Sequence, residues 1–474
     1  MTQAASGTSS VSNVVHSTMP KESVDGTIVM AYLVASLAYL FMAIVAGMLF
    51  SLQLLQAYPF PGIELFSPGR WRMVHTDTVV YGFIANAFLA VLHWSIPRLT
   101  TSSVLSVKLS WFVFVAWQVV VVAGVVGIVM GFAQAVPWGE SPTFVDPIAQ
   151  LGLILVAINL LPPILKVAGP LDIPLWYFLA AIVWAVLVFG MGNFVPEYLL
   201  GGTASGAIIA LFHHDVVGLI VTPLGWGLMY YFVPVILERP IYSRKLALIG
   251  FWGLAVFSPF AGVRHLLYSP IPMVLQYTAM VATMALELTA ITVIINFFLT
   301  IRGQGEKLRT CMAIRWFYLG LMFYFAASVQ SVVQVTLPLR NITHFSDWVV
   351  GHSHLVMFGV FGFWILGTMV HLIPRLLGAN GWYDPNWNAW HFRLTGIGML
   401  IMFLALLIAG WIQGYHWRNL APWDVSIAAS KPFWLVRTMS GVVIFAGQAL
   451  FLFNILMTWV HRGAIPNGCR HGKR

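Results

Sequence analysis

The segment Val349-Val350-Gly351-His352-Ser353-His354 is followed, without a charged residue, by the apolar run LVMFGVFGFWILGTMVHLIP, which ends at Pro374. A run of this length can cross a bilayer as one helix. Successive residues of an α-helix are rotated by about 100°, so His352 and His354 point about 200° apart. One helix can therefore offer imidazoles to two groups on opposite sides. A neutral imidazole is unusual in hydrocarbon unless a metal or polar partner satisfies it, although two polar residues in a first helical turn remain the simpler alternative.

The composition extends this interpretation to the whole chain. It is 59% hydrophobic and only 8% charged, with a mean hydropathy of +0.86, values typical of an integral membrane protein. We predict an all-α membrane bundle of twelve spanning helices, with these apolar runs: 27–56, 75–97, 109–135, 147–165, 174–194, 204–236, 246–268, 272–301, 312–337, 349–374, 391–413 and 434–460.

Basic residues give the expected orientation. One alternating set of loops, together with the C-terminal tail, holds fifteen Lys and Arg residues, and the opposite set holds seven. Because cytoplasmic loops are enriched in basic residues, both termini are expected in the cytoplasm. The net charge of +9 is then a topology signal, and no nucleic-acid partner is implied. Residues 1–26 are predicted to form a flexible cytoplasmic arm, 27–461 the membrane domain and 462–474 a basic cytoplasmic tail.

Several histidines fall at one depth in this topology. His75, His265 and the pairs His213-His214 and His352-His354 all lie in the outer half of their predicted spans. Chance clustering is the alternative, but imidazoles from facing helices are a common way to hold haem iron. His75 and His354 suit a low-spin haem held from both faces. His352 could hold a second, high-spin haem with an open distal side.

Two further features concern the haems. Arg70 and Arg72 flank the start of the second span and could pair with haem propionates, although ordinary interfacial arginines are equally expected there. The chain has no Cys-x-x-Cys-His motif for covalent haem. Any covalently attached haem must therefore belong to a partner.

Five segments carry a family resemblance, and together with their order they extend over all but the termini: 72–76 (RMVHT), 212–218 (FHHDVVG), 227–234 (GLMYYFVP), 238–243 (ERPIYS) and 343–354 (THFSDWVVGHSH). They resemble the catalytic subunit of the haem-copper oxidoreductase superfamily, most of all its C-family (cbb-type) oxidases and the related nitric oxide reductases. The resemblance implies a multi-pass protein of the bacterial inner membrane with two b-type haems. His75 and His354 become the low-spin ligands, and His352 the high-spin ligand. His214 and His265 become ligands of a second metal, and a calcium ion near the propionates is a further expectation.

The chain departs from the oxidase pattern near this second metal. The family has a His-His pair where Gly262-Val263-Arg264-His265 stands, so one ligand is missing. The redox tyrosine of the C family is replaced by Ser258, and Gly218 supplies no phenol either. The tyrosine and serine that lead cytoplasmic protons to the site are replaced by Arg244 and Ala247. These departures disfavour four-electron reduction of oxygen.

Glu287 supplies the second clue. It lies in the middle of the eighth predicted span, where an isolated carboxylate would be costly, and nitric oxide reductases have a similar Ala-Leu-Glu segment. Two imidazoles and one carboxylate favour non-haem iron over copper. We expect the ligands to be His214, His265 and either Glu287 or Asp215, with His213 as a substitute. A protonated structural glutamate is the alternative for Glu287.

These features predict a nitric oxide reductase, with protons entering from the outer face past Glu140, Asp146 or Glu197. Electrons would come from a cytochrome c or cupredoxin-type donor subunit, in a protein otherwise surrounded by membrane lipid. A divergent cbb-type oxidase that reduces O2 is the first alternative. A non-catalytic haem b electron-transfer subunit is the second, because Arg264 places a cation where a ligand is expected. A transporter is disfavoured because no inverted repeat is visible.

Overall fold

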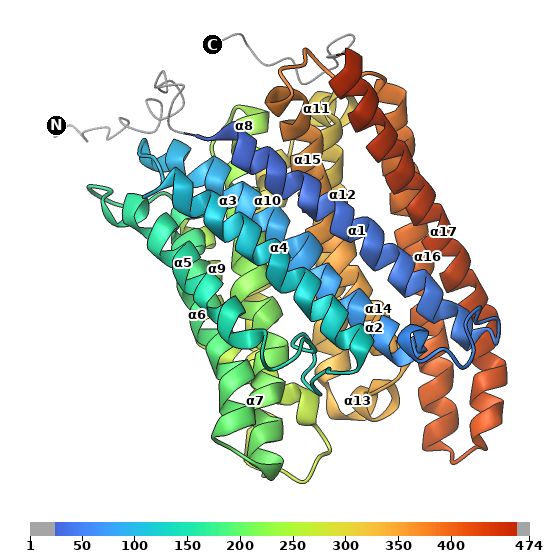
Figure 1. Cartoon of the computed structure of the whole chain (residues 1–474). Helices are drawn as coiled ribbons and strands as arrows, with labels where there is room; N and C mark the ends of the chain where they lie inside the picture. The colour runs from blue at the N-terminus through green and yellow to red at the C-terminus, as the bar shows by residue number, and fades with distance from the viewer. Residues whose placement is uncertain (1–23, 462–474) are drawn as a thin grey trace, which may run out of the picture.

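A computed structural model describes residues 24–461 (Figure 1). These residues form helices joined by short connections, and none of them lies in a strand. Twelve helical segments within this range are long and apolar enough to cross a membrane, which confirms the predicted all-α bundle. Nearly all of the arm predicted at 1–26, and the whole tail predicted at 462–474, lie outside the described residues.

Several spans are built from more than one helical element. Two short helices, α11 and α13, lie outside the spans. The elements in chain order are: α1 (Gly26–Leu54), η1 (Glu64–Phe66), α2 (Pro68–Asp77), η2 (Thr78–Ile84), α3 (Ala85–Thr100), α4 (Val107–Met130), α5 (Asp146–Leu165), α6 (Ile173–Tyr198), α7 (Gly202–Asp215), η3 (Val216–Val221), α8 (Thr222–Leu237), α9 (Arg244–Ala261), η4 (Gly262–Leu266), α10 (Met273–Ile301), α11 (Gly305–Thr310), α12 (Met312–Val335), α13 (Leu337–Thr343), α14 (Asp347–His354), η5 (Leu355–Gly362), α15 (Phe363–Leu376), α16 (Pro385–Arg418) and α17 (Trp423–His461).

The second span begins earlier than its hydropathy predicts. The apolar run starts at His75, but α2 begins at Pro68, a residue type that suits the first helical position because its fixed φ is already helical. The polar turn that contains Arg70 and Arg72 is therefore part of the helix. His75 consequently sits two turns inside α2 rather than at its start.

Three spans contain a π-helical segment just inward of their histidines. η2 follows His75, η3 follows His213 and His214, and η5 follows His354 directly. His265 lies in a 3₁₀ segment, η4, at the outer end of α9. π-helical turns are rare in proteins and frequently occur at functional sites. Each of them re-aims the histidines relative to the rest of its span.

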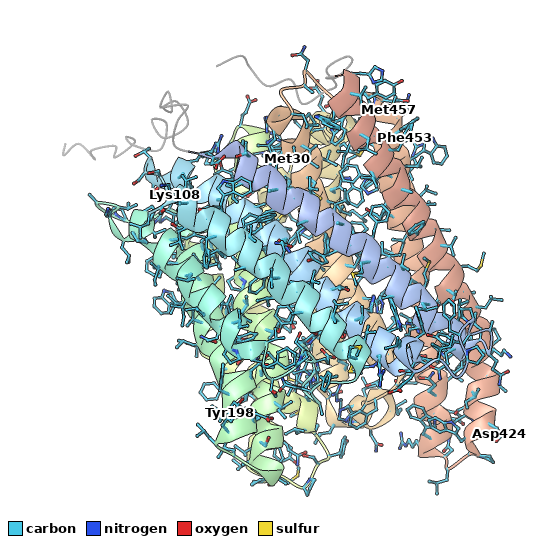
Figure 2. All side chains as sticks on the ribbon, in the orientation of Figure 1. Met30, Lys108, Tyr198, Asp424, Phe453 and Met457 are labelled. Carbon is cyan, nitrogen blue, oxygen red and sulfur yellow. The ribbon has the colours of Figure 1, made fainter. Side chains whose placement is uncertain are left out.

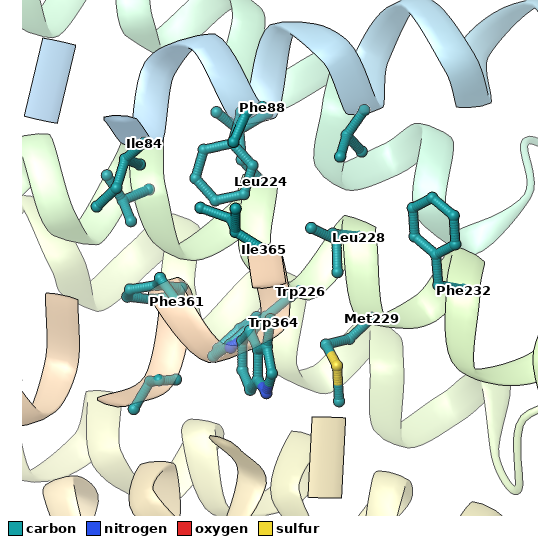
Figure 3. Close-up of a cluster of buried hydrophobic side chains, with 14 of the residues drawn as sticks. Ile84, Phe88, Leu224, Trp226, Leu228, Met229, Phe232, Phe361, Trp364 and Ile365 are labelled. Carbon is teal, nitrogen blue, oxygen red and sulfur yellow. The ribbon is translucent and has the colours of Figure 1, made fainter. Parts of the chain in front are cut away.

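Buried side chains of α3, α8 and α15 pack together in the core of the bundle (Figure 3). Trp226, Phe361 and Trp364 are fully buried there. Gly225 lets α8 approach closely, since a Cβ at that position would lie 2.6 Å from the Phe361 ring. Interiors packed to this density respond to a change of even one methylene. The spans that carry the site are therefore held rigidly.

The two ends of the bundle differ. Lys108 lies near the end where the described chain begins and finishes, whereas Tyr198 and Asp424 lie at the opposite end (Figure 2). At this second end the hairpins α6–α7 and α16–α17 project beyond α2, α13 and α14 (Figure 1). The predicted spans 391–413 and 434–460 leave residues 414–433 as an outer loop. That expectation is wrong, because α16 continues to Arg418 and α17 begins at Trp423, so a helical hairpin replaces most of the loop.

Candidate functional site

His75 on α2 and His354 on α14 lie opposite one another. Their ring centroids are 6.0 Å apart and their planes differ by 21°. The Nδ1 of His75 donates a hydrogen bond to the carbonyl of Ala43 at 2.7 Å, and that of His354 donates to Val350 at 2.9 Å. Since a carbonyl can only accept, both Nδ1 atoms carry the proton and both Nε2 atoms keep a free lone pair. This donor set fits a haem iron bound from both faces.

The first helix controls the position of His75, a contribution that hydropathy does not reveal. Gly47 on α1 faces the imidazole so closely that a Cβ there would lie 2.8 Å from Nδ1. Ala43, one turn earlier, supplies the carbonyl that orients the ring. In the sequence, this support for His75 shows only as a glycine, Gly47, one turn after Ala43. The pattern can be interpreted only once α1 is known to pack on α2.

The guanidinium groups near this pair differ in their partners. Arg437 on α17 is buried and lies within electrostatic range of both His75 and His354. Arg72 lies near His75 as well. Arg70 instead pairs with Glu64 and donates to the carbonyl of Val129 at 2.8 Å, so it anchors the outer loops. Arg437, which sequence reasoning missed, is better placed than Arg70 to face the acidic groups of a haem.

A cavity of about 140 Å³ lies beside the pair, on the other side of α14. Its wall contains His213 and His214 from α7, His265 from η4, Glu287 from α10 and His352 from α14. The structure thus brings all of the predicted metal-site side chains except Asp215 to one cavity wall. The wall also includes two tryptophans, one tyrosine and two arginines, namely Trp138, Trp226, Tyr324, Arg264 and Arg340.

His352 is oriented by a residue that the sequence did not single out. Its Nδ1 lies 3.2 Å from the Oε1 of Gln330 on α12. An amide oxygen only accepts, so Nδ1 is protonated and Nε2 is free. This outer hydrogen bond is of the kind that orients imidazole ligands. The donor chemistry fits a haem bound on the cavity side of α14, opposite the His75–His354 pair.

The three cavity imidazoles near the second-metal position are unequally spaced. The rings of His213 and His265 stack with centroids 4.3 Å apart, whereas His214 and His265 are 6.2 Å apart. His213, which was expected only as a substitute, is therefore the nearer neighbour of His265. No three His, Cys, Asp or Glu side chains between residues 24 and 461 are already arranged around a common point. The imidazole nitrogens and the carboxylate oxygens of the wall are atom types that bind metal ions. These side chains would have to rotate to coordinate one ion together.

Ser258 occupies the position where the oxidase pattern has a phenol. Its hydroxyl donates to Asp215 at 3.0 Å and lies 3.4 Å from Nε2 of His214. A Cβ at Gly218 would lie 2.2 Å from the Ser258 oxygen, so that position has no room for a larger residue. Asp215 is thereby tied to Ser258 and lies behind His214 rather than on the cavity wall.

Glu287 and Arg264 share one end of the cavity. Glu287 lies beside Ser331 and within electrostatic range of Arg264. Arg264 donates to the hydroxyl of Ser331 at 3.3 Å. The cation that replaces the missing histidine is therefore held next to the only carboxylate of the cavity wall described here.

Two buried carboxyl groups lie where α2 meets the connection between α4 and α5. Glu140 accepts from Thr76 at 3.2 Å, and Asp77 accepts from Ser141 at 2.7 Å. Oε2 of Glu140 and Oδ1 of Asp77 are buried, and the two carboxyl groups share a hydrogen bond that requires a proton on one of them. Burial, reinforced by the nearby charge of Asp77, raises the pKa of Glu140 to about 9, so its carboxyl is protonated at neutral pH.

A second small cavity of about 20 Å³ adjoins these groups and is lined by Asp77, Asp146 and Asn193. It is large enough for one water molecule. Trp138, whose ring lies 6.1 Å from that of His213, links this region with the main cavity. Glu197, also predicted on the proton route, lies on the exposed outer end of α6.

Comparisons with known proteins agree with this architecture. The family described as Cytochrome C and Quinol oxidase polypeptide I matches residues 27–443. Cytochrome c oxidase subunit 1 of Rhodobacter capsulatus is 28% identical over 87% of this chain and 82% of its own length. The cbb3-type subunit CcoN1 of Stutzerimonas stutzeri is 27% identical over 85% and 88%, respectively. A heme-copper terminal oxidase dimer solved by cryo-EM shares the fold, with a TM-score of 0.77 and 13% identity over 94% of this chain and 86% of that one.

Proposed function

This chain belongs to the cytochrome c and quinol oxidase polypeptide I family, the catalytic subunits of the haem-copper oxidase superfamily, and on that premise we propose that it reduces nitric oxide. The reaction is 2 NO + 2 electrons + 2 protons, giving N2O and water. The family binds haems and a metal centre. We assign two b-type haems, one at His75 and His354 and one at His352, and a non-haem iron near His214, His265 and Glu287.

The position of Glu287 carries this proposal. Its carboxylate lies in the wall of the same cavity as His213, His214, His265 and His352. A carboxylate added to imidazoles favours iron over copper. When bound, the metals would supply electrons and polarise the substrate as Lewis acids. Glu287 would hold a proton beside the reacting oxygen, while Arg264 and Ser331 keep its side chain in place.

The local departures from the oxidase pattern support the same conclusion. Reduction of O2 to water requires four electrons, and the phenol that assists this step in related oxidases is absent at Ser258 and excluded at Gly218. Reduction of two NO molecules needs only two electrons and no such phenol. The chemistry proposed for the cavity therefore matches what its wall can provide.

Protons would enter from the outer face. Glu140 is buried and protonated at neutral pH, and a poised carboxylic acid can both release and recapture a proton. Asp77 and Asp146 line the neighbouring water-sized cavity. From there Trp138 leads to the wall beside His213. The calcium ion expected near the propionates stays a prediction.

A divergent oxidase that reduces O2 is the second candidate, and one observation favours it. His213 stacks on His265, so three imidazoles approach the metal position, and copper prefers nitrogen ligands to carboxylates. In that case His213 would be a ligand and Glu287 would not. A non-catalytic haem b subunit would instead leave the second metal position without an ion.

Metal content and substrate preference distinguish the three candidates. The purified complex should contain three iron atoms per chain beyond those of any partner, no stoichiometric copper, and faster turnover of NO than of O2. Glu287→Gln should lower NO turnover by about 100-fold, as expected when a positioned proton donor is lost. Glu306→Gln, an exposed glutamate on α11, is the control and should leave turnover unchanged. Stoichiometric copper with rapid O2 turnover would support the oxidase instead.

A further inference from the structure

The guanidinium of Arg340 is buried in the wall of the histidine-lined cavity. Arg340 lies on the short helix α13 and is 6% exposed. Its Nε is buried without a hydrogen-bond partner, and no carboxylate within residues 24–461 forms an ion pair with it. A buried charge is costly unless an ion pair or a ligand compensates it. The charge of Arg340 therefore favours a negatively charged ligand in the cavity.

Arg264 adds a second positive charge to the same wall. It lies within electrostatic range of Arg340, and it donates a hydrogen bond to the hydroxyl of Ser331 at 3.3 Å. Glu287 and Asp215 lie within electrostatic range as well, but in the described part of the chain neither forms an ion pair with Arg264. Asp215 does not line the cavity, so the wall carries two guanidinium groups and the single carboxyl group of Glu287. The wall is therefore positively charged even when Glu287 is ionised.

The indole of Trp138 supplies a third hydrogen-bond donor. Trp138 lines the cavity, and its Nε1 is buried without a hydrogen-bond partner. Its φ of 65° is unfavourable for a residue with a Cβ, and the hydroxyl of Tyr81 holds it there by donating to its carbonyl. Such strain often occurs at functional positions, and buried N–H groups without a partner are rare. We call Arg264, Arg340 and Trp138 the donor cluster.

The donor cluster lies beside the expected second metal. Arg264 directly precedes His265, and the Trp138 ring lies 6.1 Å from that of His213. Both guanidinium groups are within electrostatic range of His213 and His265. The carboxylates of a haem project from the edge of its ring, whereas a second metal lies over its open face. A group held next to His265 would therefore be a free ligand rather than part of the haem.

The donor types indicate the chemical class of this ligand. A guanidinium presents its N–H groups in a planar fork that matches two oxygens of a planar anion. The cavity, of about 140 Å³, has room for a small inorganic anion. We propose that the donor cluster binds a small planar oxyanion of the nitrate and nitrite class, next to the second metal position. This inference goes beyond the proposed function, because the binding does not depend on which gas is reduced.

Nitrate titration of the purified holoenzyme tests the proposal. Nitrate is a weak ligand for iron, so its binding reports on the guanidinium groups. Calorimetry at low ionic strength should show saturable binding, weakened about tenfold or more in Arg340→Gln and in Arg264→Gln, because each loses charge-assisted hydrogen bonds. Arg340→Lys keeps the charge without the fork and should bind with intermediate affinity. Arg393→Gln, which removes an exposed arginine beside Trp390 on α16, is the matched control and should bind as the wild type.

Infrared spectroscopy of the wild type provides a direct measurement. The difference spectrum between ¹⁴N-nitrate and ¹⁵N-nitrate should show a split N–O stretching band, because contact through two oxygens lowers the symmetry of the ion. An unsplit band, or the absence of saturable binding, would overturn the proposal. This experiment needs no variant, so it decides the question even if an arginine substitution causes loss of haem.

Two other arrangements give different results, and each would refute the proposal. Nitrate bound directly to haem iron would shift the Soret band and would bind equally tightly to the arginine variants. A haem carboxylate already seated on the donor cluster would prevent nitrate binding, and Arg340→Gln would then alter the propionate bands of the resonance Raman spectrum. None of these measurements requires turnover, so failure here is distinguishable from failure of the proposed function.

Discussion

Gly47 on α1 faces the ring of His75, and a Cβ added there would lie 2.8 Å from Nδ1 and 3.0 Å from Cε1. We therefore expect Gly47→Ala to displace the imidazole and to destabilise the fold by about 1–3 kcal/mol, as for overpacking in general. The low-spin haem signal in the optical and EPR spectra should decrease. Gly69→Ala on α2 is the control, because no atom lies within 4 Å of its added Cβ. Intact low-spin spectra in the Gly47 variant would contradict the proposed role of His75.

Glu140 makes the stability of the protein depend on pH. Burial and the charge of Asp77 raise its pKa from 4.5 to about 9, partly offset by Arg72. A carboxyl whose pKa is raised by folding contributes stability that is fully present below about pH 4.5 and is lost as the pH rises through about 9. Glu140→Gln should remove this dependence, which has a ceiling of about 1.4 kcal/mol per pH unit. Thermal unfolding should therefore be measured at pH 6 and pH 9. The stability of Glu140→Gln relative to the wild type should be greater at pH 9 than at pH 6, whereas that of Glu306→Gln should be the same at both.

At the residue scale, the sequence singled out the histidines but not the residues that orient them. His75, His354 and His352 stand out because imidazoles are rare in apolar runs, and the structure places them where two haems could be bound. Ala43, Gly47 and Gln330 orient those rings, but glycine, alanine and glutamine occur throughout membrane helices. Their role depends on which helices are neighbours, and no local pattern carries that information.

At the scale of elements, the π-helical segments show what hydropathy cannot predict. Apolar runs at 75–97, 204–236 and 349–374 predicted three uninterrupted helices, and the spans are indeed there. Each is nevertheless interrupted by a segment with one wider turn, η2, η3 or η5. A wider turn does not change which residues make up the apolar run, so hydropathy does not detect it. Its effect appears only in the structure, as a rotation of one half of the span relative to the other.

Removal of one residue tests the importance of these segments. Deletion of Val217 should convert η3 (Val216–Val221) into an α-helix and rotate His213 and His214 by about 100° relative to α8. The protein should still insert and remain monodisperse in detergent, but the second metal should be lost from elemental analysis. Deletion of Ala168, in the connection between α5 and α6, is the control and should keep the metal. Retention of the metal in the Val217 deletion would show that the π-helical turn does not position the site.

At the scale of the whole molecule, the number and order of the spans followed from composition, but the shape of the outer face did not. α16 has 34 residues, about 51 Å of helix at 1.5 Å per residue, whereas the hydrocarbon core of a bilayer is about 30 Å thick. Arg418 of α16 and Asp424 and Lys431 of α17 lie in the helical ends beyond the predicted spans 391–413 and 434–460. Packing between α16 and α17 keeps these polar ends helical, and such long-range support is invisible in a hydropathy profile.

The charge asymmetry of the loops predicts how this shape sits in the membrane. Both ends of the described chain lie at one end of the bundle (Figure 1), as an even number of spans requires. The loops and tail at that end hold fifteen basic residues against seven at the other, so we expect it to face the cytoplasm. A green fluorescent protein fused after His461 should fluoresce, whereas alkaline phosphatase fused after Asn419 should be active because it folds only outside the cytoplasm. The reverse pattern would place the histidine-lined cavity and the buried carboxyl groups Glu140 and Asp77 toward the cytoplasm and would contradict the predicted topology.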